Sequence, residues 1–187
     1  MRGGPDTIAP EKQGTSSMLK QITVCAAAAV LAASPAFAAT KVFTAKLSGD
    51  VETSKTGSKA TGAARIVVDT ERKTIDVTME FTGLKIAELA DGLVARPVGP
   101  IHLHNYLANG DVVLVLPAPF GTAYSDTAKG FNVTMKGFAY PEGAKLVGSN
   151  LTFDAFLTAM ASGSVVLNVH TDKFDQGEIS GQVVAGG

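Results

Sequence analysis

Three histidines are the residues of this chain whose type and spacing could bind a metal ion. His102 and His104 lie in the apolar run 100–105, and His170 lies in a second apolar run, 165–171. In a β-strand the side chains at i and i+2 share a face, so His102 and His104 project on the same side. If the two strands are neighbours in one sheet, three imidazoles converge on a patch of its outer surface. That is the ligand type and number of a copper or zinc site.

The second apolar run alternates in the same way. Its valines and its leucine, at positions 165, 167 and 169, share one face, and Asn168 and His170 share the other. We therefore expect both strands to bury their aliphatic residues and to present the imidazoles outward. Copper is favoured over zinc, because imidazole-only ligation outside the cytoplasm suits copper and its place in the affinity order.

Three polar residues could support the imidazoles from a second layer: Asn168, Asp172 and Glu178. A carboxylate or amide there could orient an imidazole through its second nitrogen. For Asp172 and Glu178 the favoured role is to fix the turn over residues 171–177 through backbone hydrogen bonds.

Other interpretations of these residues stay open. The histidines could be polar residues on a solvated strand face, satisfied by water or by backbone carbonyls. Asp172, Asp175 and Glu178 could suggest calcium, but their spacing lacks the Asp-rich loop that such a site requires. No motif of nucleophilic hydrolysis or of nucleotide binding occurs in a supporting context, so we predict no catalytic residue.

Residues 1–38 are typical of an N-terminal extension with a signal peptide. A short basic start at Met18 precedes the apolar stretch 22–33, and Ala36-Phe37-Ala38 offers small residues for cleavage after Ala38. The apolar stretch is too short for the roughly 20 residues of a spanning helix. We expect a periplasmic or secreted protein without a membrane span in its mature form. Met1 and Met18 both remain possible starts.

The mature chain, residues 39–187, is long enough for one domain with its own core. It is weakly acidic, which gives no electrostatic reason to expect a nucleic acid as partner. The one cysteine, Cys25, falls in the leader, so the mature domain offers neither disulfides nor thiolate ligands.

Alternating apolar and polar residues, separated by turn residues, predict an all-β domain. The expected strands are 42–48, 62–69, 74–81, 100–105, 111–116 (ended by Pro117), 130–140 (ended by Pro141), 165–171 and 178–184. Two segments break this pattern: 84–99, with one helical turn, and 150–162, with Asn150 as N-cap. Both segments could cover the histidine face.

The residues from about 42 to 184 resemble the CHRD domain family. The most specific part is Leu167-Asn168-Val169-His170-Thr171, followed by Gly177-Glu178-Ile179-Ser180-Gly181-Gln182, where Ser180 replaces the usual arginine. The pair in Ile101-His102-Leu103-His104 also fits, although the residues after it differ from the family pattern. The resemblance implies an extracytoplasmic, immunoglobulin-like β-sandwich and says little about chemistry.

The histidine pattern is also similar, more weakly, to that of copper-zinc superoxide dismutase, a Greek-key sandwich with a His-x-His pair and a further copper-binding histidine on a late strand. Three histidines and no mature cysteine cannot supply that enzyme's complete ligand set and disulfide. A mononuclear site is what could remain.

The sequence therefore predicts an exported CHRD-type binding module that holds a copper-like ion at His102, His104 and His170. Two alternatives are a metal-free interaction or structural domain of the cell envelope, with an envelope or extracellular protein as partner, and a mononuclear copper redox enzyme. The sequence favours a non-enzymatic role.

Overall fold

The computed structural model describes residues 39–51, 53–108 and 111–186, which lie within one compact unit. Within residues 107–116 only backbone is described. The predicted leader, with Cys25, lies outside the described residues. None of the helices in the described part is long and apolar enough to cross a membrane.

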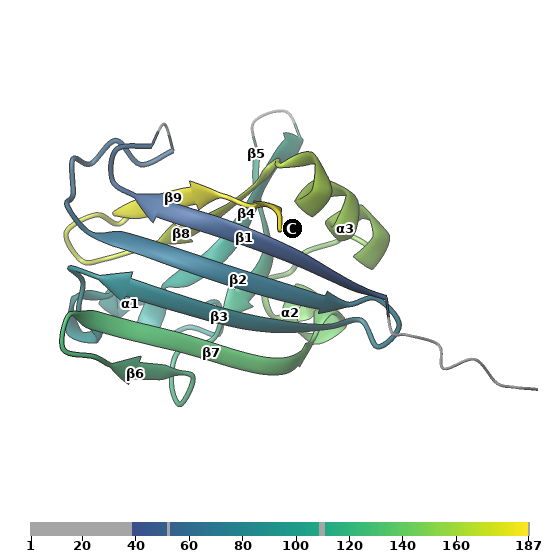
Figure 1. Cartoon of the computed structure of the whole chain (residues 1–187), viewed down its shortest axis with the longest axis horizontal. Coiled ribbons are helices and arrows are strands. Elements are labelled where there is room, and N and C mark those ends of the chain that lie inside the picture. The colour runs from purple at the N-terminus through teal and green to yellow at the C-terminus, as the bar shows by residue number, and fades with distance from the viewer. Residues whose placement is uncertain (1–38, 52, 109–110, 187) are drawn as a thin grey trace, which may run out of the picture. The chain divides into compact units, whose positions relative to one another are not determined.

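The described chain folds mainly into antiparallel strands joined in one sheet (Figure 1). The strands are β1 (Thr40–Ser48), β2 (Thr61–Asp69), β3 (Thr74–Thr82), β4 (Ile101–Ala108), β5 (Asp111–Ala118), β6 (Tyr124–Asp126), β7 (Gly130–Ala139), β8 (Val165–Val169), β9 (Ile179–Gln182) and β10 (Val184–Ala185). Their order in the sheet is β5-β4-β8-β9-β1-β2-β3-β7-β6, and β10 pairs with β1.

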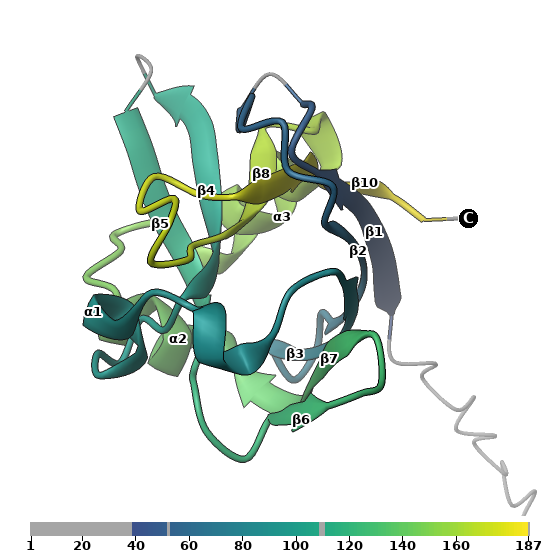
Figure 2. The ribbon, with the colours of Figure 1, turned by 90° about the vertical axis from the view of Figure 1, so that its left-hand side faces the viewer.

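The sheet curls so that β4, β5 and β8 lie across from β2, β3 and β7 (Figure 2). Each strand turns its alternate aliphatic and aromatic residues inward, as the period-2 pattern of the sequence predicts. On β3, for example, Ile75, Val77, Met79 and Phe81 are buried, whereas Thr78 and Glu80 are exposed. The predicted all-β sandwich is confirmed.

Short helices fill the connections: η1 (Ile86–Glu88), α1 (Asp91–Val94), α2 (Tyr140–Leu146) and α3 (Phe153–Ser162). α2 was not expected, because Pro141 was interpreted only as the end of a strand. Proline is also well tolerated in the first turn of a helix, where it loses no intrahelical hydrogen bond, and Pro141 occupies that place. The predicted N-cap Asn150 is wrong: Thr152 caps α3, with its hydroxyl accepting from the Ala155 N–H.

Two smaller differences concern strand ends. Pro117 lies inside β5 rather than after it, at a position where β5 forms the edge of the sheet. An edge strand tolerates proline because the missing N–H can face away from the ladder. The three-residue β6, which was not predicted, is too short to show an alternating pattern.

The loop between β1 and β2 is tied to β9 by hydroxyl groups. Ser180, which is fully buried, accepts a hydrogen bond from the Ser54 hydroxyl at 2.7 Å and also contacts the Thr53 hydroxyl. The small side chain at position 180 thus leaves room for this loop to close over β9.

Candidate metal centre

The histidine-bearing strands β4 and β8 are neighbours, and their register decides where the imidazoles lie. His102 pairs with Asn168 and His104 with Val166. Just beyond β8, the His170 N–H donates to the Pro100 carbonyl at 2.9 Å, which continues the ladder by one residue. Because paired residues point to the same face, all three histidines project from one side of the sheet. The adjacency that the sequence could only assume is confirmed.

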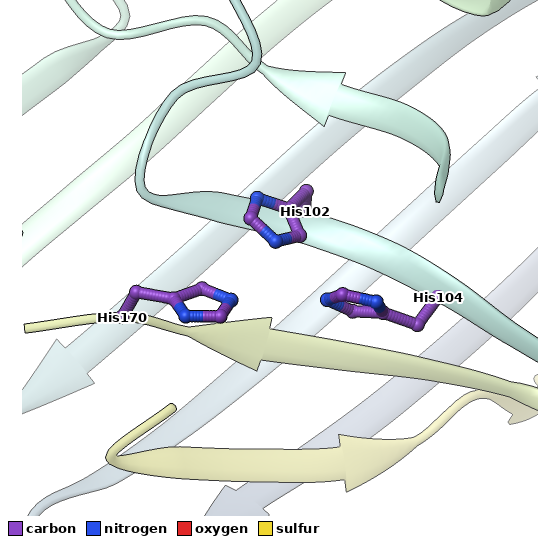
Figure 3. Close-up of side chains that lie close together, drawn as sticks. All are labelled: His102, His104 and His170. Atoms are coloured by element: carbon purple, nitrogen blue, oxygen red, sulfur yellow. The ribbon is translucent and has the colours of Figure 1, made fainter. Parts of the chain in front are cut away.

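The three imidazoles form a compact group. One potential ligand atom from each ring can be chosen so that all three lie within 4.8 Å of one another. Ring centroids are 4.4 Å apart for His102 and His170 and 4.6 Å for His102 and His104. Figure 3 shows His104 and His170 pointing toward each other along the strands, with His102 beside the gap between their rings.

The histidines do project outward from the sheet, but the prediction of a site at the surface is wrong. His102 is 5% exposed and His170 is 7% exposed, and His104 is partly buried. Segments outside the sheet close over this face. The residues before β4 and the loop after His170 both contact the rings, as the following hydrogen bonds show.

Two of the rings are oriented by backbone carbonyls. His102 Nδ1 lies 3.1 Å from the Gly99 oxygen, and His170 Nδ1 lies 2.6 Å from the Asp175 oxygen. Because a carbonyl can only accept, Nδ1 carries the proton in both rings and Nε2 keeps its lone pair. Such a bond on the second nitrogen is the usual way in which a protein fixes the tautomer and orientation of a metal-binding histidine.

The buried side-chain atoms without a hydrogen-bond partner gather on this face. In the described part of the chain they are both ring nitrogens of His104, Nε2 of His170 and Oδ1 of Asn168. Each such atom costs about 1–3 kcal/mol, so proteins rarely leave one unpaired. A metal ion bound between the rings would satisfy the lone pairs of His104 and His170 together.

The electrostatics keep the rings neutral. Burial, together with the neighbouring imidazoles of His170 and His104, lowers the pKa of His102 to about 3. Burial and His170 lower the pKa of His104 to about 4. Burial also lowers the pKa of His170, although the Asp175 carbonyl and carboxylate oppose the shift. At neutral pH each ring therefore has a free lone pair and no proton to lose before it binds a metal.

The lowered pKa values predict that the metal-free protein loses stability in mild acid. Between pH 6.5 and about 4 His102 and His104 bind protons in the unfolded state and not in the folded state, so the free energy of unfolding falls as the pH falls. The lowered pKa of His170 acts in the same direction. The slope is at most about 1.4 kcal/mol per pH unit for each histidine. Urea unfolding between pH 5 and 7.5, above most carboxylate titrations, measures it. A flat profile in this range would contradict neutral, buried imidazoles.

The residues proposed for the second layer have separate places. Asn168 Nδ2 donates to the Gln176 carbonyl at 3.1 Å, on the loop that also supplies the Asp175 oxygen. Asp172 accepts the Asp91 N–H at 2.8 Å, and Glu178 accepts hydrogen bonds from the hydroxyls of Ser58 and Thr171.

Neither carboxylate is hydrogen-bonded to an imidazole in the described structure. Both tie loops beside the centre, but not by the expected backbone bonds within 171–177: Asp172 binds the Asp91 backbone, and Glu178 binds two hydroxyls. The structure does not support the calcium alternative. Among the described residues, the convergent group of potential ligands consists of the three histidines alone.

Sequence reasoning missed the groups that hold and border the centre. The Gly99 and Asp175 carbonyls are backbone atoms, which leave no signature in the sequence. Tyr106 could have been found, because it continues the i, i+2 series of His102 and His104; its ring centroid lies 6.3 Å from that of His104. Tyr106 is 36% exposed and so lies at the rim.

The arrangement can bind a metal ion that accepts nitrogen ligands. Bonds of about 2.0 Å in a tetrahedral site place ligand atoms roughly 3.3 Å apart, so the ligand atoms, which now lie within 4.8 Å of one another, would have to approach further around an ion. The donor set is three neutral imidazoles with open ligand positions, which suits copper or zinc.

Comparison with known proteins identifies a family. The family model of the CHRD domain matches residues 43–183. No curated protein matches the chain. No solved structure matches it either.

Proposed function

The chain belongs to the CHRD domain family, and from this premise we propose that it is an exported metal-binding module that holds a copper ion between His102, His104 and His170. The family leaves the chemistry open, so the proposal rests on the site itself. Export rests on the signal-peptide pattern of residues 1–38, with periplasmic or extracellular location after cleavage near Ala38.

The proposal rests on two facts about the same face: three imidazoles converge there, and several of their ring nitrogens have no hydrogen-bond partner among the described residues. The three imidazoles meet on one face, and three of the four unpartnered buried atoms of the described structure are nitrogens of His104 and His170. A purely structural cluster would gain stability by pairing these atoms or by replacing them with apolar groups. A binding site, in contrast, must keep one lone pair on each ring free for its ligand; the other nitrogen of neutral His104 carries the proton.

Copper is preferred over zinc for two reasons. Among divalent ions, copper binds more tightly than zinc at a given set of nitrogen ligands. An exported protein also acts outside the cytoplasm, where imidazole-only ligation suits copper. An envelope protein could be a further partner of such a module, as a donor or acceptor of the metal.

We expect the purified protein to bind one copper ion, and the variants His102→Ala and His170→Ala to lose most of that binding. Removing one of three ligands leaves too few donors to hold the ion between the strands. Metal content and copper titration measure the effect. The matched control is Glu80→Gln, which removes an exposed carboxylate on β3, and should leave stoichiometry and affinity unchanged.

Binding that is equal in all four proteins would mean that copper sits elsewhere, for instance at the chain terminus. No binding above background in the unmodified protein would leave the metal-free interaction domain as the better explanation. Copper-dependent turnover that disappears with the histidines would instead support the redox enzyme.

A further inference from the structure

We propose that the three-histidine centre selects monovalent copper, Cu(I), over the divalent ions Cu(II) and Zn(II). This inference rests on the proposed function and specifies the charge of the ion that the site is built to hold. Three features carry it: the burial of the ligands, the absence of a charged ligand from the described cluster, and the number of ligands.

The first feature is burial. His102 and His170 are less than one tenth exposed, and both ring nitrogens of His104 are buried. Moving an ion from water to such a place costs desolvation free energy that rises with the square of its charge, so a divalent ion is penalised about four times as much as a monovalent ion. The site therefore disfavours divalent ions unless ligand charge compensates for the loss.

The second feature is that the ligands carry no negative charge to offset the desolvation cost of a divalent ion. Among the side chains that the structure describes, the convergent ligands are neutral imidazoles only. The nearby carboxylates are engaged elsewhere: Glu178 with Ser58 and Thr171, and Asp172 with the Asp91 backbone. Asp175 presents its carbonyl oxygen, not its carboxylate, to the His170 ring. The Asp175 carboxylate acts on His170 only through space, so a divalent ion would keep most of its charge in this environment.

The third feature is the coordination number. Cu(II) prefers a tetragonal arrangement with four in-plane nitrogen or oxygen ligands, and Zn(II) prefers four tetrahedral ligands, so with three imidazoles either ion would have to recruit at least one further ligand, such as water. In the described part of the chain, the fourth buried atom without a partner is Oδ1 of Asn168, which is uncharged. The Nδ2 of the same amide donates to the Gln176 carbonyl. Three imidazoles suffice for Cu(I), a closed-shell ion that accepts three ligands.

The test compares affinities in the full chain carrying Cys25→Ser, which removes its one thiol. Cu(I) is titrated without oxygen against a chromophoric Cu(I) chelator with ascorbate present, and Cu(II) and Zn(II) are titrated against chelators of their own. We expect Cu(I) to bind at least about 100-fold more tightly than Cu(II), which raises the reduction potential of the bound copper by about 118 mV relative to the aqueous couple.

Two matched variants of Tyr106, at the edge of the site, test whether the lack of ligand charge causes the preference for Cu(I). Tyr106→Glu places a carboxylate beside His104, and Tyr106→Gln places a neutral group of the same shape there. An anion attracts a divalent ion twice as strongly as a monovalent one, so the preference for Cu(I) should be about tenfold smaller in the Glu variant than in the Gln variant.

The outcomes separate the two levels of the proposal. Cu(II) or Zn(II) binding as tightly as Cu(I) in the unmodified chain would overturn the charge selectivity and leave the metal-binding function standing. The absence of histidine-dependent binding of all three ions would overturn both. A Cu(I) preference that is the same in the Glu and Gln variants would refute the electrostatic cause.

Discussion

Replacing His104 by leucine is expected to stabilise the metal-free protein by about 1–3 kcal/mol while removing its copper site. Both ring nitrogens of His104 are buried and lack a hydrogen-bond partner, so the folded state loses their hydration without compensation. Leucine is of similar size and needs no partner. For a domain of this length the gain corresponds to about 2–4 °C in Tm per kcal/mol.

With copper bound, the unmodified protein should become more stable than His104→Leu. A ligand that binds only the folded state stabilises it by about 4.1 kcal/mol at a free concentration of 1,000 Kd, which exceeds the gain expected from leucine. Unmodified protein gains this amount, and His104→Leu gains little or nothing. Thermal unfolding of both proteins with a chelator, and again with copper, measures the crossover.

His102→Leu is the matched control, because it removes an imidazole of the same cluster that does have a partner. Its Nδ1 donates to the Gly99 carbonyl, so leucine at position 102 leaves a buried acceptor unpaired. We expect this variant to lose copper without the gain in stability. If His104→Leu also destabilised the metal-free protein, the nitrogens of His104 would have partners in solution, and the case for His104 as a metal ligand would weaken.

The sequence correctly predicted which histidines share a face within one strand, because this depends only on the two-residue period of a strand. Alternation along a strand places His102 and His104 on one face and Leu103 on the other, whatever the rest of the fold does. The pairing of β4 with β8 could only be assumed. More than 60 residues separate His104 from His170 along the chain, and α2 and α3 lie within that interval.

Burial of the histidines was mispredicted for a related reason. The sequence shows which face of a strand is polar, and it offered 84–99 and 150–162 as possible covers, but it did not show that 84–99 and the loop after His170 would bury the rings. The covering contacts here come from backbone atoms, such as the Gly99 and Asp175 carbonyls. Backbone carbonyls are present at every residue, so no residue type marks the ones that bind a ring.

The loop that covers His170 depends on Gly177, and Gly177→Ala is expected to weaken both the fold and the metal site. Gly177 has φ of +114°, a conformation that residues with a Cβ adopt only with strain. A Cβ added there would lie 2.5 Å from Cγ of Asn168 and closer still to its amide atoms. Strain and overlap together should lower the free energy of unfolding by about 2–5 kcal/mol.

Gly177→Ala should also weaken metal binding, because it disturbs the hydrogen bond that orients the His170 ring through Nδ1. Asp175 and Gln176, which directly precede Gly177, supply the carbonyls that hold His170 and Asn168. If the loop moves away from Asn168, the Asp175 carbonyl moves with it and His170 loses its fixed orientation. Loss of such support usually weakens metal binding 10- to 100-fold, roughly the effect expected here.

Gly121→Ala separates strain from overlap. Gly121 also has positive φ, +130°, but a Cβ there would meet no atom within 4 Å. This control should show the strain alone, with copper affinity unchanged. Combining Asn168→Ala with Gly177→Ala removes the overlapping amide, so the pair should be less destabilising than the sum of the two single changes.

Urea unfolding and copper competition on the four variants measure both effects. Equal behaviour of Gly177→Ala and Gly121→Ala would show that the loop does not position His170. Recovery of stability without recovery of affinity in the double variant would instead show that the Asn168 amide itself, through its bond to the Gln176 carbonyl, is needed to hold the loop over the centre.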